Sequence, residues 1–396
     1  MNCLIAYDSF KDSISSTELG NQTNTTIKQL LKNDRENMIL TISDGGEGLL
    51  ESLKVSLNLE FTEVTSVIGP LGNTITSKYA HTSSSNSNEN ERFAVIEMAM
   101  TSGIEMVPVN QRSPMNTTTY GVGQLIDHAV TVGGYKKIYI GAGGSATNDA
   151  GLGALQSVGL TFTFFNPTLT PSYIYGRDLS NISSIQVPKE IQNLYNDVEF
   201  IFLTDVQNPF IGVNGAVACF SKQKGATESD QLILEQSMTR ITKTIYPRDI
   251  STVPGSGAAG GLASGFISYF NAKVEKGIDF VLSHYHLSEK LEKKQIDMII
   301  TGEGCFDSTT LNGKVVSKIM NISSEYNIPL MIICGKKNIS TDIEKEIFDK
   351  FQGKCVIYDL VSEFGERESL NNTKHCIDSL IKKVLLKFLQ SNNIPF

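Results

Sequence analysis

Eight short runs of apolar residues are spaced along the chain, and most of them end in Gly, Ser, Asp or Glu. They lie at residues 3–11, 38–48, 93–103, 136–149, 198–210, 297–308, 329–337 and 355–360. Nearly continuous hydrophobicity over so few residues is typical of strands that are buried on both faces of a parallel sheet. We therefore predict a β-strand at each run.

Stretches with helical periodicity lie between these runs. Ser15 and Glu18 have the spacing of a capping box, which predicts a helix from there to about Leu31. Further helices are predicted within residues 117–134, closed by glycines, within 149–159, and within the amphipathic segment 374–390. Strands that alternate with helices favour an α/β fold with parallel sheets.

Residues 65–98 interrupt this alternation. They read as a β-hairpin with a polar tip at 83–91, a low-complexity loop for which we expect no function. A β-rich middle predicts a second domain inserted into the first. We predict a parallel-sheet α/β domain from residues 1–68 and 285–396, and a mixed α/β domain from 69–284.

Composition narrows the class of protein. The chain has 396 residues, of which 40% are hydrophobic, and a net charge of −8 without a Lys/Arg run. We therefore expect no nucleic acid and no anionic membrane as partner. The cysteines are scattered without a C-x-x-C pair, and no apolar run approaches the ~20 residues of a membrane span. These features, with a strand at the N-terminus in place of a signal peptide, predict a cytoplasmic protein with free thiols.

The glycine-rich segment 138–151 combines a short apolar run with the turn Gly143, Gly144, Ser145 and several potential helix caps. Glycine permits a close backbone approach, and a helix start favours an anion. The segment lacks the last glycine of the dinucleotide fingerprint and the lysine of a P-loop. Two interpretations stay open at this point: an anion site, or a tight turn before a buried helix.

A second glycine-rich segment spans residues 253–265. Gly260 and Gly261 fit close helix packing, whereas Gly255, Ser256 and Gly257 are candidates for an anion cradle of backbone N–H groups.

Acidic side chains follow several of the predicted strands. Ligands of open parallel sheets bind outside the carboxyl ends of the strands. The polar residues at these ends are Asp8, Ser9, Lys11, Asp44, Asp205, Glu303 and Asp307. Single aspartates at such places usually cap turns, but this many predict carboxylates that hold a cation or accept a proton. Local cations occur at Lys11, Lys222, Lys224, Lys314 and Arg112. Carboxylates, glycine turns and a few cations together indicate phosphoryl transfer from a nucleotide.

An ordered series of motifs then resembles one family. It comprises DSFKDSISSTE, SDGGEG, EMAMTSG, TTTYGVGQLI, GGSATNDAGLGAL, TDVQNP, KQKGA, PGSGAAGGL and ITGEGCFDSTTLNGK. The series spans residues 3–335 and resembles the type I glycerate kinases. The resemblance implies a kinase that phosphorylates glycerate with ATP and Mg²⁺, many members giving 2-phosphoglycerate. It also implies two α/β domains, one flavodoxin-like and one inserted, and leaves monomer or homodimer open.

The sequence departs from the usual pattern of that family at a few positions. Tyr7 replaces a common Pro, Asp12 a Gly beside Lys11, and Ala150 a Gly. Ser221 and Lys222 stand where Gly-Pro is frequent. Because the acidic and glycine positions remain, we interpret these changes as drift.

The resemblance lets roles be assigned as hypotheses. We assign catalytic roles to Lys11 and to Asp205, which would accept the proton of the glycerate hydroxyl. We assign the ligation of Mg²⁺ to Asp44 and Asp307. Substrate binding is assigned to Arg112, Ser9 and Asp8, and cofactor binding to Gly143, Gly144, Ser145, Gly255, Ser256, Gly257 and Glu303. We expect the Gly143–Ser145 turn to line an interdomain cleft and to bind either the ATP phosphates or the glycerate carboxylate. The rival functions are a kinase of another small hydroxy acid and a sensor that binds a sugar acid without turnover.

Overall fold

The computed structural model describes residues 1–8, 10, 13–32, 37–41, 49–57, 59–83, 92–285, 287–308, 310–312 and 315–396. The chain divides into two compact units, the first formed by Met1–Ser43 with Val281–Phe396 and the second by Asp44–Phe280. The second unit is thus an insertion in the first. The first boundary lies at Ser43 and not at residue 68, because β3 (Glu60–Ile68) pairs with β4 (Thr74–His81) in the sheet of the second unit.

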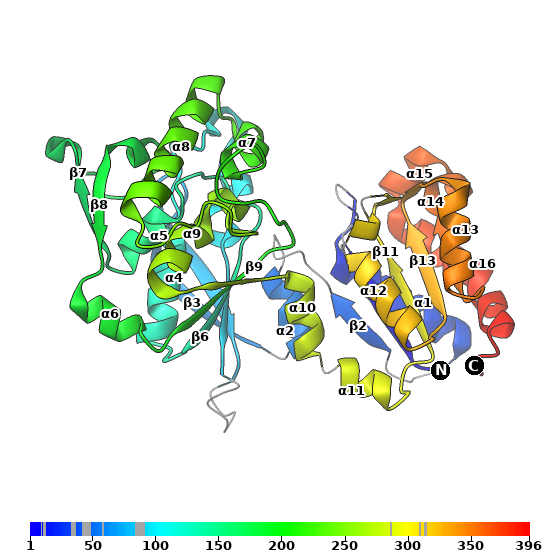
Figure 1. The fold of residues 1–396 in the computed structure, drawn as a ribbon. Helices are drawn as coiled ribbons and strands as arrows, with labels where there is room; N and C mark the ends of the chain where they lie inside the picture. The colour runs from blue at the N-terminus through cyan, green and yellow to red at the C-terminus, as the bar shows by residue number, and fades with distance from the viewer. Residues whose placement is uncertain are drawn as a thin grey trace. The chain divides into compact units, whose positions relative to one another are not determined.

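The first unit is built on a five-stranded parallel sheet, shown in Figure 1 with its helices. Its strands are β1 (Cys3–Tyr7), β2 (Met38–Thr41), β11 (Met298–Gly302), β13 (Leu330–Cys334) and β15 (Cys355–Asp359). Their spatial order is β2-β1-β11-β13-β15. Numbered within the unit this is 2-1-3-4-5, the flavodoxin-like order, so the predicted fold class is confirmed.

Helices and small elements complete this unit. They are α1 (Ser16–Leu31), α11 (Leu287–Glu292), β12 (Cys305–Asp307), α12 (Val315–Glu325), β14 (Lys336–Asn338), α13 (Thr341–Lys350), α14 (Leu360–Phe364), α15 (Glu366–Asn371) and α16 (Thr373–Ser391). Helices α1 and α16 bury one face of β1, and α12 packs against β11 and β1. The predicted cap is confirmed, since the Ser15 hydroxyl accepts a hydrogen bond from the Glu18 N–H at 3.3 Å.

The second unit is built on a six-stranded mixed sheet in the order β10-β9-β6-β5-β4-β3. Strands β5 (Ala94–Glu97), β6 (Lys137–Gly141), β9 (Glu199–Leu203) and β10 (Lys273–Glu275) run parallel, whereas β4 is antiparallel to both β3 and β5. The eight strands predicted from the apolar runs are β1, β2, β5, β6, β9, β11, β13 and β15, and all are confirmed.

The remaining elements of the second unit lie around this sheet. They are α2 (Leu49–Leu57), α3 (Ala99–Ser102), α4 (Tyr120–Thr131), α5 (Leu152–Ser157), β7 (Thr161–Phe164), β8 (Ile182–Gln186), α6 (Lys189–Tyr195), α7 (Ala216–Phe220), α8 (Glu228–Arg240), α9 (Leu262–Phe270) and α10 (Gly277–His284). The boundary between the two units along the chain falls within α10, after Phe280.

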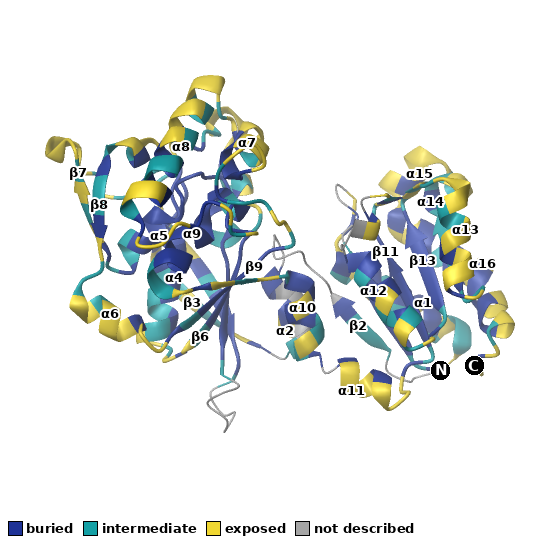
Figure 2. Cartoon of the chain, in the orientation of Figure 1, coloured by how far each residue is buried: buried dark blue, intermediate teal, exposed yellow. Residues whose placement is uncertain are grey.

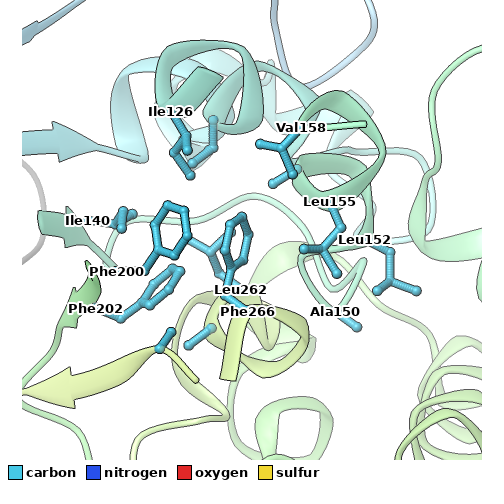
Figure 3. Packing of buried hydrophobic residues seen from close by; sticks show 14 of the residues in the cluster. Ile126, Ile140, Ala150, Leu152, Leu155, Val158, Phe200, Phe202, Leu262 and Phe266 are labelled. Carbon is cyan, nitrogen blue, oxygen red and sulfur yellow. The ribbon is translucent and has the colours of Figure 1, made fainter. Parts of the chain in front are cut away.

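The main core of this unit lies between the sheet and helices α4, α5 and α9. In Figure 3, Phe200 and Phe202 of β9 face Phe266 of α9, with ring centroids 5.3 and 5.4 Å apart. Figure 2 shows β11 and β13 of the first unit as buried and the outer faces of α13 and α16 as largely exposed. Burial of large aromatic rings is a major stabilising term, so this core holds the carboxyl end of β9 rigidly in place.

The predicted β-hairpin is present, because β4 and β5 are antiparallel, with Ala80 paired with Val95 and His81 with Ala94, and the polar segment 83–91 lies between them in sequence. Residues 84–91 themselves lie outside the described residues. Strand β4 also forms a hairpin with β3, whose turn lies at residues 69–73, where the Gly69 N–H donates to the Asn73 carbonyl at 2.7 Å. The six cysteines are all free, and Cys219 and Cys305 are the exposed ones. Within the described part of the chain, every helix is too short or too polar to cross a bilayer.

Candidate active site

The carboxyl ends of the parallel strands in the second unit lie level with one another. Gly141 of β6 pairs with Leu203 of β9, and Leu203 pairs with Glu275 of β10. The segments that follow these residues therefore emerge side by side at one edge of the sheet. This is the edge at which open α/β sheets bind their ligands.

The Gly143–Ser145 turn follows β6 at this edge. Gly144 is exposed and has φ +64°, a conformation that favours glycine. Its carbonyl accepts a hydrogen bond from the Ile104 N–H at 2.8 Å, which ties the turn to the segment after α3. Among the residues that the structure describes, no acceptor is recorded for the N–H groups of Gly143, Gly144 and Ser145. Gly144 is exposed, Gly143 is partly exposed and Ser145 is buried, so the turn has donors without a recorded acceptor at the surface and just beneath it.

Directly after the turn the chain becomes fully buried. Thr147, Asn148 and Asp149 have no exposed surface although all three are polar. The Thr147 hydroxyl donates to the carbonyl of Thr117 at 2.8 Å, and the Thr117 hydroxyl donates to the carbonyl of Ala146 at 3.0 Å. These reciprocal bonds tie the segment to the start of α4.

The carboxylate of Asp149 is the hydrogen-bond acceptor at the start of α5. It accepts from the N–H and the hydroxyl of Thr119, both at 2.7 Å, and from the N–H groups of Gly151 and Gly153 at 3.1 and 3.3 Å. Burial nevertheless raises the pKa of Asp149 to about 6, because desolvation of the charged form outweighs these bonds. The helix start expected to hold an anion is thus occupied by the protein's own carboxylate, and the N–H groups open to an external anion lie in the turn before it.

Lys224 is the buried cation of this region. Its side chain is only 2% exposed, and its Nζ donates to the carbonyl of Thr147 at 2.7 Å. Burial lowers the pKa of Lys224 to about 7, with the negative charge of Asp149 acting in the opposite direction. The neighbouring Gly225 has φ +91°, and a Cβ there would meet the Arg112 carbonyl at 2.1 Å, so this loop packs tightly on the Arg112 segment.

Asp205 lies two residues beyond the end of β9 and is half-buried. The N–H of Thr204 still donates to the carbonyl of Glu275 on β10 at 3.0 Å. The chain turns after this bond, where the Thr204 hydroxyl accepts from the N–H of Val206 at 3.4 Å. A rigid strand followed by a short turn still fixes the position of Asp205.

Two of the three backbone N–H groups in the Gly255–Gly257 loop donate to carbonyls of the protein itself. The N–H of Ser256 donates to Val253 at 3.2 Å, and the N–H of Gly257 donates to Asn208 at 3.0 Å. The Ser256 hydroxyl also bonds the Val253 carbonyl, at 2.6 Å. A Cβ at Gly257 would meet the Pro209 carbonyl at 2.1 Å. Two of the three N–H groups of this loop are therefore engaged within the protein, and the loop packs closely beside β9.

The guanidinium of Arg112 is partly engaged within its own segment. Its Nε donates to the Val107 carbonyl at 3.3 Å, and its Nη2 lies 3.4 Å from an Oε1 of Glu105, which is mostly exposed. An exposed ion pair of this kind is weak, so Arg112 is free to exchange Glu105 for another carboxylate.

In the first unit, Asp8 and Glu303 lie at the point where the strand order reverses. Tyr7 pairs with Gly302, and the N–H of Asp8 donates to the Gly302 carbonyl at 2.9 Å. Glu303, which follows Gly302, is 5% exposed. The β1/β11 junction is the ligand-binding position of flavodoxin-like sheets, so this structure brings two of the predicted residues together there.

Asp307 ends the short strand β12 and is half-buried, and its N–H donates to the Thr310 hydroxyl at 3.0 Å. Ser9, Lys11 and Asp44 lie outside the described residues, as does Lys314. Within the described ranges, no group of three or more His, Cys, Asp or Glu side chains is arranged to hold a metal ion.

The sequence alone did not assign a specific role to two buried residues of this region, Asp149 and Lys224. Asp149 read only as one of several helix caps, and Lys224 only as one of several local cations. The one available signal was the density of Thr and Asn in the segments 117–119 and 147–149, which is unusual for buried backbone.

The fold and this edge define an α/β protein whose second unit offers anion donors and a positioned carboxylate at the ends of parallel strands. A model of the glycerate kinase family matches residues 3–386. The chain belongs to the glycerate kinase family.

Relatives with assigned activities support this placement. The chain is 35% identical over 346 residues to a glycerate kinase of Bacillus subtilis, covering 86% of each protein. It is 31% identical over 338 residues to a glycerate 2-kinase of Escherichia coli, covering 85% of each. A crystal structure of a candidate glycerate kinase 2 from Salmonella typhimurium LT2 superposes with a TM-score of 0.76 at 29% identity, over the full length of both chains.

Proposed function

We propose that the protein transfers the γ-phosphoryl group of ATP to a hydroxyl of D-glycerate, giving 2-phosphoglycerate and ADP. The family match over residues 3–386 carries this proposal, because it takes in the polar strand ends of both units. The name of the Escherichia coli relative, a glycerate 2-kinase, favours the 2-hydroxyl as acceptor. We expect the reaction in the cytoplasm, where ATP is available.

In this proposal the Gly143–Ser145 turn binds phosphate oxygens. Three N–H groups in one turn make an anion-binding concavity, and the buried segment behind them keeps them in place. Stabilisation by prearranged donors costs no reorganisation during the reaction. The turn would therefore favour the charge that builds up on the transferred group.

Asp205 orients the acceptor hydroxyl. The hydroxyl oxygen of glycerate forms a bond to the γ-phosphorus, the bond from that phosphorus to the bridging oxygen of ADP breaks, and the hydroxyl proton passes to the Asp205 carboxylate. Kinases that phosphorylate hydroxyl groups use an aspartate in this way. Arg112 binds the glycerate carboxylate, because a guanidinium matches a carboxylate with two parallel hydrogen bonds.

Mg²⁺ fits the donors of this chain. The ion prefers one or two carboxylates together with phosphate oxygens, and Asp307 offers a half-buried carboxylate at the end of β12. We assign its ligation to Asp307 and Asp44. When bound, the ion would neutralise charge on the transferring phosphate. In the first unit we assign substrate binding to Asp8 and Ser9, nucleotide binding to Glu303 and a catalytic role to Lys11.

An assay of ADP release with a panel of small hydroxy acids tests the proposed function. We expect turnover with D-glycerate and little with glycolate, lactate or tartrate. Release of ADP with another acid but not with glycerate would favour a different hydroxy-acid kinase. Binding of glycerate without any ADP release would favour a sensor.

A further inference from the structure

A cavity of about 620 Å³ opens beside β10 in the second unit. Its floor is apolar and is formed by Ile267 of α9 with Ala272 and Val274 at β10. Ile267 and Ala272 are buried, so the floor belongs to the rigid core of the unit. This volume lies within the range of about 300–1,000 Å³ that is typical of small-molecule sites. It is much larger than the volume that a three-carbon acid occupies.

Polar side chains line the rest of the cavity. They are Gln207, which follows β9, together with Glu275, Lys276 and Asp279 at the end of β10 and in α10. Two carboxylates and one ammonium give these groups a net negative charge. Such a cavity disfavours an anion such as glycerate or a triphosphate and suits a neutral, partly apolar group that has hydroxyls.

The Gly255 loop closes one side of the cavity. Val253 and Pro254 line it, and a Cβ at Gly255 would lie 2.6 Å from the Val274 side chain. Gly255 has φ +78°, so glycine is required there both by conformation and by the close approach. The second glycine-rich segment therefore forms one wall of the cavity.

The position of the cavity relative to the Gly143–Ser145 turn follows from the strand register. Glu275, Leu203 and Gly141 lie level on β10, β9 and β6. Adjacent strands are about 4.8 Å apart, so the end of β10 and the turn after β6 are separated by two spacings, roughly 10 Å. That separation is comparable to the reach of an extended triphosphate.

We propose that this cavity binds the adenosine moiety of ATP, while the phosphates extend along the strand ends to the Gly143–Ser145 turn. The purine lies on the apolar floor, and the Gln207 amide, which carries both a donor and an acceptor, reads the adenine edge as glutamine does in DNA recognition. Glu275 and Asp279 accept hydrogen bonds from the ribose hydroxyls. This inference rests on the proposed function for the identity of the nucleotide.

Direct binding of ADP, measured by titration calorimetry, tests the cavity without turnover. Ala272→Phe adds a ring to the floor, and we expect it to weaken ADP binding at least tenfold while the glycerate KM changes less than twofold. Lys273→Ala is the matched control on the same strand, because Lys273 pairs with Glu199 and does not line the cavity. It should bind ADP as the wild type does.

A second variant keeps the test independent of folding at Ala272. Gln207 is exposed, so Gln207→Ala should fold normally. We expect it to reduce the preference for ADP over the inosine diphosphate, which carries a carbonyl in place of the adenine amino group. Wild-type ADP affinity in a folded Ala272→Phe protein together with unchanged base preference in Gln207→Ala would overturn the assignment.

The two proposals fail in different ways. If Ala272→Phe weakens ADP binding in a protein that does not phosphorylate glycerate, the nucleoside site stands and the proposed function is wrong. If the wild type phosphorylates glycerate and both variants bind ADP normally, the proposed function stands and the nucleoside site is elsewhere.

Discussion

The Nζ of Lys224 donates a 2.7 Å hydrogen bond to the carbonyl oxygen of Thr147, and almost no surface of this lysine is exposed. A buried ammonium thereby holds the segment that follows the Gly143–Ser145 turn. The two residues are far apart in sequence but join the loop after α7 to the loop after β6. The position of the Gly143–Ser145 turn therefore depends on an amine whose charged form is costly to bury.

That cost predicts a dependence of stability on pH. The pKa of Lys224 is about 7 in the folded state and ~10.4 in an unfolded chain, so the unfolded state binds more protons between these values. The free energy of unfolding should therefore rise with pH across this window, by up to ~1.4 kcal/mol per pH unit. Urea unfolding of wild type and Lys224→Met at pH 7 and pH 9 measures it. The rise should be smaller in the variant, and Lys222→Met, an exposed control, should keep it. Equal slopes in all three proteins would contradict the account.

Asp149→Asn should destabilise the second unit. The carboxylate accepts four hydrogen bonds from Thr119, Gly151 and Gly153, whereas an amide would direct N–H groups at some of these donors. A buried donor left without an acceptor costs about 1–3 kcal/mol, so we expect a loss of roughly 2–4 kcal/mol. Urea unfolding measures the loss, with Asp197→Asn, an exposed aspartate, as control. A change below about 0.5 kcal/mol, the usual range for surface substitutions, would mean that the network carries little stability.

Gly144→Ala should raise the KM for ATP several-fold. The alanine Cβ would lie 3.2 Å from the Cβ of Ala99 and would disfavour φ +64°, which distorts the N–H groups of the turn. Gly134→Ala is the matched control, because Gly134 has φ +68° with open space around it. Both variants should lose about 1 kcal/mol of stability from the left-handed backbone. If both also have the same KM for ATP as the wild type, the turn does not contact the nucleotide.

Arg112→Ala should weaken the use of glycerate and leave ATP unaffected. A hydrogen bond to a charged group is worth about 1.5–3 kcal/mol, so the glycerate KM should rise roughly tenfold or more. Glu105→Gln removes the partner carboxylate but keeps the guanidinium, and should not raise the glycerate KM. An unchanged glycerate KM in Arg112→Ala would remove Arg112 from the site.

Asp205→Asn should lower kcat by about 10²- to 10⁴-fold, the usual contribution of a positioned base. The amide keeps the size of the side chain but does not accept the proton, so ADP binding and the melting temperature should persist. Asp197→Asn, before the same strand, should retain full kcat. A rate near that of the wild type at saturating glycerate and Mg²⁺ would exclude Asp205 as the base.

Local signals in the sequence were sufficient for the strands and for the first helix. Continuous apolar runs mark strands because both sheet faces are buried, and the Ser15 cap depends only on the residues next to it. The flavodoxin-like order required more than local pattern, and came from the family resemblance. The boundary of the inserted unit was misplaced because β3 pairs forward with β4, a choice that periodicity does not reveal.

The site was less accessible to sequence. Nothing in the segment KQKGA distinguishes the exposed Lys222 from the buried Lys224, since their difference comes from packing on Thr147 and Arg112. Gly255–Gly257 and Gly143–Ser145 look alike as glycine turns. They differ because the carbonyls of Val253 and Asn208, one near and one distant in sequence, accept from two of the three N–H groups of the first turn, whereas no acceptor is recorded for those of the second.

The phosphorus-31 NMR spectrum of a reaction containing the purified protein, ATP, Mg²⁺ and D-glycerate tests the central claim most directly. A phosphate on the 2-hydroxyl couples to the single proton of that carbon, so the account predicts a new phosphomonoester doublet that grows as the ATP signals decline. A triplet would show transfer to the 3-hydroxyl and correct the position of transfer. The absence of any new phosphomonoester signal, with ATP intact, would contradict the assignment of this chain as a glycerate kinase.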